Sequence, residues 1–277
     1  MFKGQLLSRR ALLRGAGVIA LSRLDAMQSV SEYGVSTLLE GTGMVRIPPG
    51  EFLMGSPNGN ADERPVHRVS ITKGFEMSKC EVTQAQWEAV MSDAHSGPGV
   101  RVVNVDGAAV SSKPSRFQGA SLPVESVSWE DVGLFLKRLN ARDTRHAWRL
   151  PTEAEWEYAC RAGGEGEPGL GAIAWYKANS GDRTQSVATK EPNAWGLHDM
   201  QGNVAEWVQD WYSPDYYEDS PVADPKGPEG PETGSYRVIR GSCWHNTSED
   251  CRAAIRSFDF PVSRFDYVGF RLVRTAK

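Results

Sequence analysis

Glycine and proline interrupt this sequence so often that it cannot build long helices or long, evenly spaced strands. The 277 residues include 28 glycines and 16 prolines, and every periodic segment is short. Such a chain is limited to short elements joined by many turns, and its 9 tryptophans are bulky enough to anchor a core without long helices. Because no internal repeat divides the sequence, we expect one loop-rich domain.

Local patterns predict both strands and helices within that domain. Strand-like segments lie at residues 44–47, 52–55, 67–71 and 236–240. Thr83, Ser128 and Thr152 each have the spacing of an N-cap residue with a partner side chain three positions later, so short helices are predicted to begin there. This mixture predicts an α+β fold with a few short helices.

The N-terminal residues predict export. Arg9 and Arg10 stand just before an apolar stretch at residues 11–21, which Arg14 interrupts, and Ala26 offers a small residue for cleavage. The stretch is too short to cross a membrane, which takes about 20 residues. We therefore interpret residues 1–26 as a signal peptide for the twin-arginine export machinery, which predicts a periplasmic or secreted protein. The alternative is an amphipathic N-terminal helix of a cytosolic protein.

The remaining residues divide into a linker at 27–42 and a domain at 43–277. The net charge of −4 comes without a basic stripe that could neutralise phosphates, so we do not expect nucleic acid as a partner. No later segment is long and apolar enough to form a stable membrane span. A peptide or a small molecule is the expected substrate class.

Export also bears on the four cysteines, which are Cys80, Cys160, Cys243 and Cys251. In an oxidising compartment an even number of cysteines favours disulfides, and four cysteines allow three pairings. None of them has the short CxxC spacing of a zinc or redox site.

Seven short motifs match one known family in order along the chain. They lie at residues 49–56, 81–84, 123–129, 149–157, 202–207, 240–244 and 269–271, and they include Gly202-Asn203-Val204-Ala205-Glu206-Trp207 and Gly269-Phe270-Arg271. Together they span nearly the whole domain and resemble the formylglycine-generating enzyme family, also called sulfatase-modifying factors. The resemblance implies an α+β, loop-rich fold related to C-type lectins, with an irregular antiparallel sheet and few short helices.

In the enzymes that name this family, two loop cysteines bind copper(I) and oxidise a sulfatase cysteine to formylglycine. The corresponding loop of this chain contains Cys243, His245 and Cys251, and it does not reproduce the spacing of the copper pair. These three residues are the candidate catalytic set, as a modified thiolate site that could still favour Cu(I). Alternatively, the cysteines form disulfides, and the resemblance then implies the pair Cys160–Cys251 and leaves Cys80–Cys243.

The resemblance also implies a calcium site. Asp199, Gly202, Val204 and Glu206 fall where the family holds Ca²⁺ with side-chain oxygens at the ends and backbone carbonyls between them. Carboxylate and carbonyl oxygens suit this hard cation. The expected role is structural, because the ion would fix an irregular loop. The alternative is that Asp199 and Glu206 cap turns or pair with arginines.

Three functions are consistent with the sequence. The first is oxidative modification or maturation of a periplasmic peptide or small molecule, because the family includes an exported member required for maturing the pyoverdine chromophore. The second is a non-catalytic, C-type-lectin-like binding module that uses the insert at residues 92–120. The third is formylglycine formation on a co-exported sulfatase, which requires the copper pair.

Overall fold

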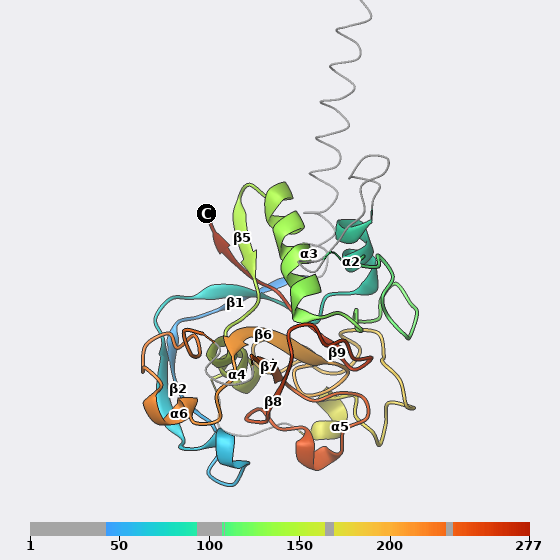
Figure 1. Ribbon diagram of the computed structural model, residues 1–277. Coiled ribbons are helices and arrows are strands. Elements are labelled where there is room, and N and C mark those ends of the chain that lie inside the picture. The colour runs from blue at the N-terminus through green and yellow to red at the C-terminus, as the bar shows by residue number, and fades with distance from the viewer. Residues whose placement is uncertain (1–42, 93–106, 108, 164–168, 231–234) are drawn as a thin grey trace, which may run out of the picture.

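Short capped helices and turn-bounded strands build the computed structural model, which describes residues 43–92, 107, 109–163, 169–230 and 235–277 (Figure 1). The predicted signal peptide and linker lie outside the described residues. So do residues 93–106 and 108, which make up part of the insert at 92–120.

The first sheet brings the two ends of the domain together. Its strands are β1 (Met44–Ile47), β4 (Phe75–Ser78), β10 (Val273–Ala276) and β5 (His146–Arg149). They lie in the order β1-β4-β10-β5, and every neighbouring pair is antiparallel. The C-terminal strand β10 is therefore an inner strand, and Figure 1 shows the C-terminus beside β5.

Two further sheets complete the β-structure of the described residues. β2 (Gly50–Met54) pairs antiparallel with β3 (His67–Ile71). The third sheet has the order β8-β7-β6-β9, with β8 at Arg256–Asp259, β7 at Arg237–Arg240, β6 at Ala205–Trp211 and β9 at Val268–Gly269. Its β6–β9 pair is parallel, and the other pairs are antiparallel.

The three longer helices begin at capping boxes, in which the N-cap and N3 residues satisfy each other's backbone N–H groups. α2 (Gln84–Met91) follows Thr83, α3 (Trp129–Arg142) follows Ser128, and α4 (Glu153–Arg161) follows Thr152. Helix α2 contacts α3, and α3 also contacts β5. Short helical turns lie at α5 (Leu170–Ile173), α6 (Tyr216–Asp219), η1 (Ala61–Glu63) and η3 (Ser248–Asp250).

These elements confirm the predicted α+β, loop-rich fold with few short helices and largely antiparallel sheets. β1 and β3 have the predicted bounds, β2 and β7 overlap predicted strands, and α2, α3 and α4 follow the predicted N-caps. β4, β5, β6, β8, β9 and β10 were not assigned from the sequence.

Tryptophan anchors the core, as its abundance suggested. Trp87, Trp156 and Trp207 are each 0% exposed. Trp87 stacks on Phe135 with ring centroids 5.4 Å apart, and Phe270 meets both rings at their edges. This group closes the space between α2, α3 and the chain that leads into β10, so aromatic side chains replace the long helices that the sequence cannot form.

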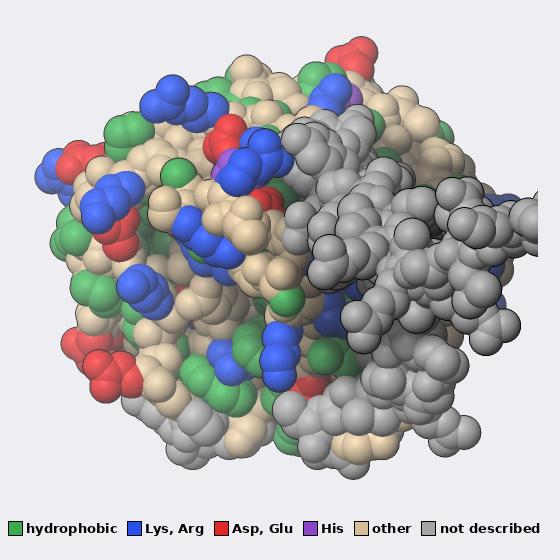
Figure 2. Space-filling view, turned by 90° about the horizontal axis from the view of Figure 1, so that it is seen from above, with side chains coloured by type: hydrophobic (Ala, Val, Ile, Leu, Met, Phe, Trp, Pro, Cys, Tyr) green, Lys and Arg blue, Asp and Glu red, His purple; other side chains and the backbone are tan. Residues whose placement is uncertain are grey.

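The surface carries both signs of charge. In the view from above, Lys and Arg side chains lie in separate groups with acidic, apolar and other surface between them (Figure 2). Within the part of the chain that the structure describes, no helix is long and apolar enough to cross a membrane.

Candidate functional site

The loop after β7 is held by the buried side chain of Arg240. Its guanidinium is 0% exposed, forms an ion pair with Glu157, and donates hydrogen bonds to the backbone carbonyls of residues 253, 254 and 255. Gly241 follows with φ +76°, and a Cβ there would lie 3.1 Å from a Met200 backbone oxygen. Both ends of the segment 241–255 are therefore fixed to the protein interior.

Cys243 and His245, two of the three residues of the candidate catalytic set, meet within this loop. The Cys243 Sγ atom lies 3.5 Å from Nδ1 and 3.7 Å from Nε2 of His245, and it donates to Asn246 Oδ1 at 2.7 Å. Cys243 is buried, whereas His245 is exposed and lies between the rings of Trp244 and Tyr267, with centroid separations of 4.8 and 4.6 Å.

Burial decides the charge state of this pair. It raises the pKa of the Cys243 thiol to about 12, although backbone hydrogen bonds from His245 and Asn246 act in the opposite direction. Burial also lowers the pKa of His245, so its imidazole is neutral at neutral pH. The pair is therefore a protonated thiol beneath a neutral, exposed base, and it differs from an activated thiolate–imidazolium pair.

In addition to burial, Cys251 raises the pKa of the Cys243 thiol, because it lies close enough for its charge to act there. Its thiol donates to the Thr247 carbonyl at 3.3 Å, which keeps its proton engaged with the backbone. Copper(I) binds thiolates, and a thiol with a pKa near 12 supplies one only at high cost. Copper(I) binding here would first have to displace the thiol protons, and it stays a prediction.

The structure differs from the predicted disulfides. All four cysteines lie in described, buried positions, and no disulfide joins any of them. Cys80 lies near the charges of Glu81 and Arg271, whereas Cys243 contacts His245 and Asn246, so the two occupy different surroundings. Compartment and cysteine count favoured pairing, but neither carries information about which thiols are neighbours.

The predicted calcium ligands lie on a second loop and on the strand that follows it: Asp199, Gly202 and Val204 precede β6, and Glu206 is its second residue. Glu206 is 1% exposed, and both of its oxygens accept from Arg271, at 2.7 to 2.9 Å. Trp156 Nε1 donates to the same carboxylate at 2.8 Å. The alternative that the sequence left open, pairing with an arginine, therefore describes Glu206.

Asp199 has a different environment. One oxygen accepts from the Ala188 backbone N–H at 2.7 Å, and the other, Oδ1, is buried without a hydrogen-bond partner. Gly202 packs so closely that a Cβ would lie 2.5 Å from the Trp175 backbone oxygen, and Val204 is 1% exposed. The loop from Asp199 to Val204 is thus held tightly, with one carboxylate oxygen unsatisfied.

Glu81 belongs to the same buried group, and the sequence did not mark it as a site residue. It is 1% exposed, and neither of its carboxylate oxygens has a hydrogen-bond partner. Burial first, and then the negative charge of Asp199, raise its pKa well above the usual value. The only sequence signal was its position two residues before the N-cap of α2, inside one of the family motifs.

These residues fit a calcium ion only in part. Asp199 offers a free oxygen, but Glu206 would have to share its carboxylate between the ion and Arg271. Among the described side chains, no group of three or more His, Cys, Asp and Glu could hold a metal ion. Calcium binding stays a prediction.

Comparison with known proteins places the chain in a family. The profile described as "Sulfatase-modifying factor enzyme 1-like domain" matches residues 31–276. The formylglycine-generating enzyme of Streptomyces coelicolor is 32% identical over 300 residues, which cover 84% of this chain and 90% of that enzyme. The resemblance stated from the motifs is confirmed.

Two further relatives show the same domain in other settings. Serine/threonine-protein kinase Pkn1 of Chlamydia trachomatis is 37% identical over 257 residues, which cover 85% of this chain but only 39% of the kinase. The chain therefore spans well under half of that relative. The structure of PvdO from Pseudomonas aeruginosa superposes with a TM-score of 0.71 at 31% identity, covering 83% of this chain and 93% of PvdO.

Proposed function

The chain belongs to the sulfatase-modifying factor enzyme 1-like family, and from this premise we propose that it is exported and acts in the oxidative modification or maturation of a periplasmic peptide or small molecule. The observation that carries the proposal is the exposed, neutral imidazole of His245 in the loop that the resemblance assigns to the family's chemistry. A neutral imidazole at the surface can accept a proton from a bound substrate.

The proposed step removes two hydrogen atoms from the substrate. His245 takes one as a proton, and dissolved dioxygen accepts the two electrons and the remaining hydrogen, so that hydrogen peroxide leaves after His245 returns its proton. Trp244 and Tyr267 flank the imidazole and would position an apolar part of the substrate against it. The step balances without copper, and the Cys243 thiol keeps its proton throughout.

The test compares purified His245→Gln and Cys243→Ala proteins with the wild type. Each is mixed with an extract from a strain that lacks the gene, and peroxide release and substrate mass are followed. We expect His245→Gln to abolish peroxide release and Cys243→Ala to retain it. Loss of activity in Cys243→Ala, together with copper binding and two titratable thiols in the wild type, would instead support the formylglycine-generating reaction.

Export is a separate part of the proposal, supported by the paired arginines at positions 9 and 10. Changing Arg9 and Arg10 to lysine should leave precursor in the cytoplasm. Unchanged secretion of this variant would contradict recognition by the twin-arginine machinery.

Calcium at Asp199, Gly202, Val204 and Glu206 is the structural part of the proposal. What supports it is the unsatisfied Asp199 Oδ1 in a tightly packed loop. A bound ion would neutralise buried negative charge and hold this loop against β6. It has no role in the proposed chemistry.

A further inference from the structure

A groove runs across the protein between α3, β6 and the loop at residues 224–229, and it is built from two connected cavities. One cavity has a volume of about 350 Å³ and the other about 590 Å³. Arg149, Gln209 and Lys226 line both of them. Cavities of this size hold a ligand larger than a single side chain.

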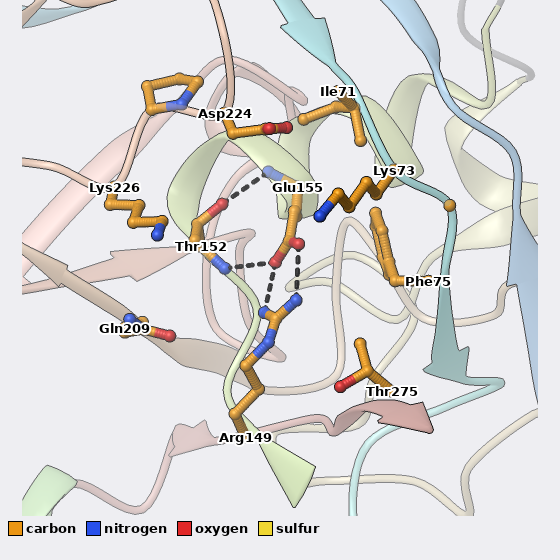
Figure 3. A pocket seen from close by; sticks show the side chains of 12 residues that line it. Ile71, Lys73, Phe75, Arg149, Thr152, Glu155, Gln209, Asp224, Lys226 and Thr275 are labelled. Atoms are coloured by element: carbon orange, nitrogen blue, oxygen red, sulfur yellow. Dashed lines mark hydrogen bonds and ion pairs between the residues drawn. The ribbon is translucent and has the colours of Figure 1, made fainter. Parts of the chain in front are cut away.

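The smaller cavity is cationic at its walls. Lys73 and Lys226 extend toward the Thr152–Glu155 hydrogen bonds from opposite sides (Figure 3). The carboxylate of Glu155 is neutralised by a two-pronged contact with Arg149 and by the backbone N–H of Thr152.

The other acidic group of this cavity, Asp224, accepts from the backbone and the hydroxyl of Thr72. Across the described residues, no salt bridge engages Lys73 or Lys226. Two ammonium groups and one carboxylate, that of Asp224, therefore face the cavity without an ion-pair partner.

The larger cavity is apolar with a third cation at its base. Arg237 lies between two indole rings, with its guanidinium carbon 3.8 Å from the centroid of Trp129 and 3.4 Å from that of Trp211. Its Nη1 donates to the Gln209 carbonyl, while its Nε is buried without a partner. Leu136, Leu150 and Pro228 add apolar wall.

Arg237 forms no salt bridge within the described part of the chain, whereas the fully buried Arg240, Arg256 and Arg271 all do. A guanidinium stacked between aromatic rings keeps its fork of donors in a fixed plane and presents it to a carboxylate. Glu229 stands exposed at the same cavity. Together with Asp224 it offsets two of the three cations Lys73, Lys226 and Arg237, so the groove keeps an excess of one positive charge.

We propose that this groove binds an acidic peptide segment, with a carboxylate between Lys73 and Lys226 and a neighbouring apolar side chain against Trp129 and Leu136. Charge complementarity selects the acid, because Lys73, Lys226 and Arg237 outnumber the carboxylates of Asp224 and Glu229 in the groove. The adjoining apolar cavity selects a large side chain next to that acid. The proposal does not depend on His245, which lines neither cavity.

The experiment is a selection of random heptapeptides displayed on phage against the purified full-length protein. Peptides with Asp or Glu beside Phe, Leu, Ile or Trp should be enriched. The same selection is run on the double variant Lys73→Gln and Lys226→Gln, and on Lys113→Gln as a control. Lys113 is exposed and pairs with Glu88 outside the groove.

Gly133 allows a variant that blocks the groove without disturbing the fold. It lines the apolar cavity within α3, and a Cβ at this position would meet no atom within 4 Å. Gly133→Glu introduces both bulk and negative charge, and Gly133→Ala is the matched control. Both replacements favour the helix, since glycine is a poor helix former.

Binding of the most enriched peptide is then measured by fluorescence anisotropy. Each single lysine change should weaken binding by about 5-fold. Gly133→Glu should weaken it by more than about 10-fold, and Lys113→Gln and Gly133→Ala should leave it unchanged. Enrichment of basic or uncharged peptides, equal enrichment on the double lysine variant, or no enrichment above background would each overturn the proposal.

Discussion

Replacing Glu81 by glutamine should stabilise this protein at alkaline pH, although Glu81 is almost completely buried. Both of its carboxylate oxygens lack hydrogen-bond partners. Asp199 and Glu206 add negative charge nearby, and Arg271, which already pairs with Glu206, is the cation that opposes them. Burial and the neighbouring carboxylates therefore raise the pKa of Glu81 well above its usual value.

The sign of the effect follows from this shift. A carboxyl group with a raised folded-state pKa binds its proton more tightly in the folded protein than in the unfolded chain. The stability that Glu81 contributes is complete when the pH is below the pKa that the group has in the unfolded chain. This stability is lost as the pH rises through the higher pKa that the group has in the folded protein. Each unit of the shift corresponds to about 1.4 kcal/mol in the free energy of unfolding. Glutamine resembles the protonated carboxyl but cannot ionise, so the variant should not lose this stability.

The assay is urea unfolding between pH 5 and pH 9 in EDTA. The wild type should lose stability with rising pH faster than Glu81→Gln, and the curves should approach each other at the acidic end. Glu51→Gln is the control, because Glu51 forms an exposed pair with Arg68, which contributes at most about 1 kcal/mol. Parallel curves for the wild type and Glu81→Gln would refute the reasoning. Calcium added afterwards tests the predicted ion separately, since its stabilisation should disappear in Asp199→Asn.

Three other predictions use groups elsewhere in the molecule. Arg240→Met should lower the free energy of unfolding by about 3–5 kcal/mol, because it leaves the buried carboxylate of Glu157 with one fewer cation beside it. Urea unfolding measures this loss, and a loss below about 1 kcal/mol would contradict the prediction. Burial would raise the pKa of Asp143, but hydrogen bonds led by Trp148 lower it to about 2. The resulting stability, about 2 kcal/mol, is present above pH 4 and lost toward pH 2, so the unfolding curves of Asp143→Asn and the wild type should differ at pH 7 and converge in acid. Finally, the Cys243 thiol should react with iodoacetamide at pH 8 only after denaturation, and rapid labelling of the folded protein would show that its pKa is not near 12.

The helices were predictable because their starting signals are local. Thr83, Ser128 and Thr152 satisfy backbone N–H groups within three residues, so neighbouring sequence contains the whole interaction. β5 was missed for the opposite reason. Its four residues pair with β10 more than a hundred positions later, and no pattern inside His146–Arg149 specifies that partner.

In the candidate site, too, contacts between sequence neighbours could be predicted and contacts between distant residues could not. Cys243 and His245 are two positions apart, so their contact could be expected from the sequence alone. Glu206 and Arg271 are 65 positions apart, and Arg271 occupies the carboxylate that the sequence assigned to calcium. Glu81 was missed because what distinguishes it is a buried carboxylate without hydrogen-bond partners, and only the surrounding packing shows this.

Two buried arginines explain why such a loop-rich fold can hold its site still. Backbone carbonyls outside sheets and helices need donors when they are buried. Arg240 donates three hydrogen bonds to the backbone carbonyls of residues 253–255. Arg271 donates to the backbone carbonyls of Ser78 and His198. Each arginine also carries a buried glutamate, so the loops are fixed by groups that lie outside residues 243–251. That segment can therefore change in sequence while the scaffold around it is kept. In this chain it holds the neutral imidazole of His245 above a protonated thiol, the pair on which the proposed function rests.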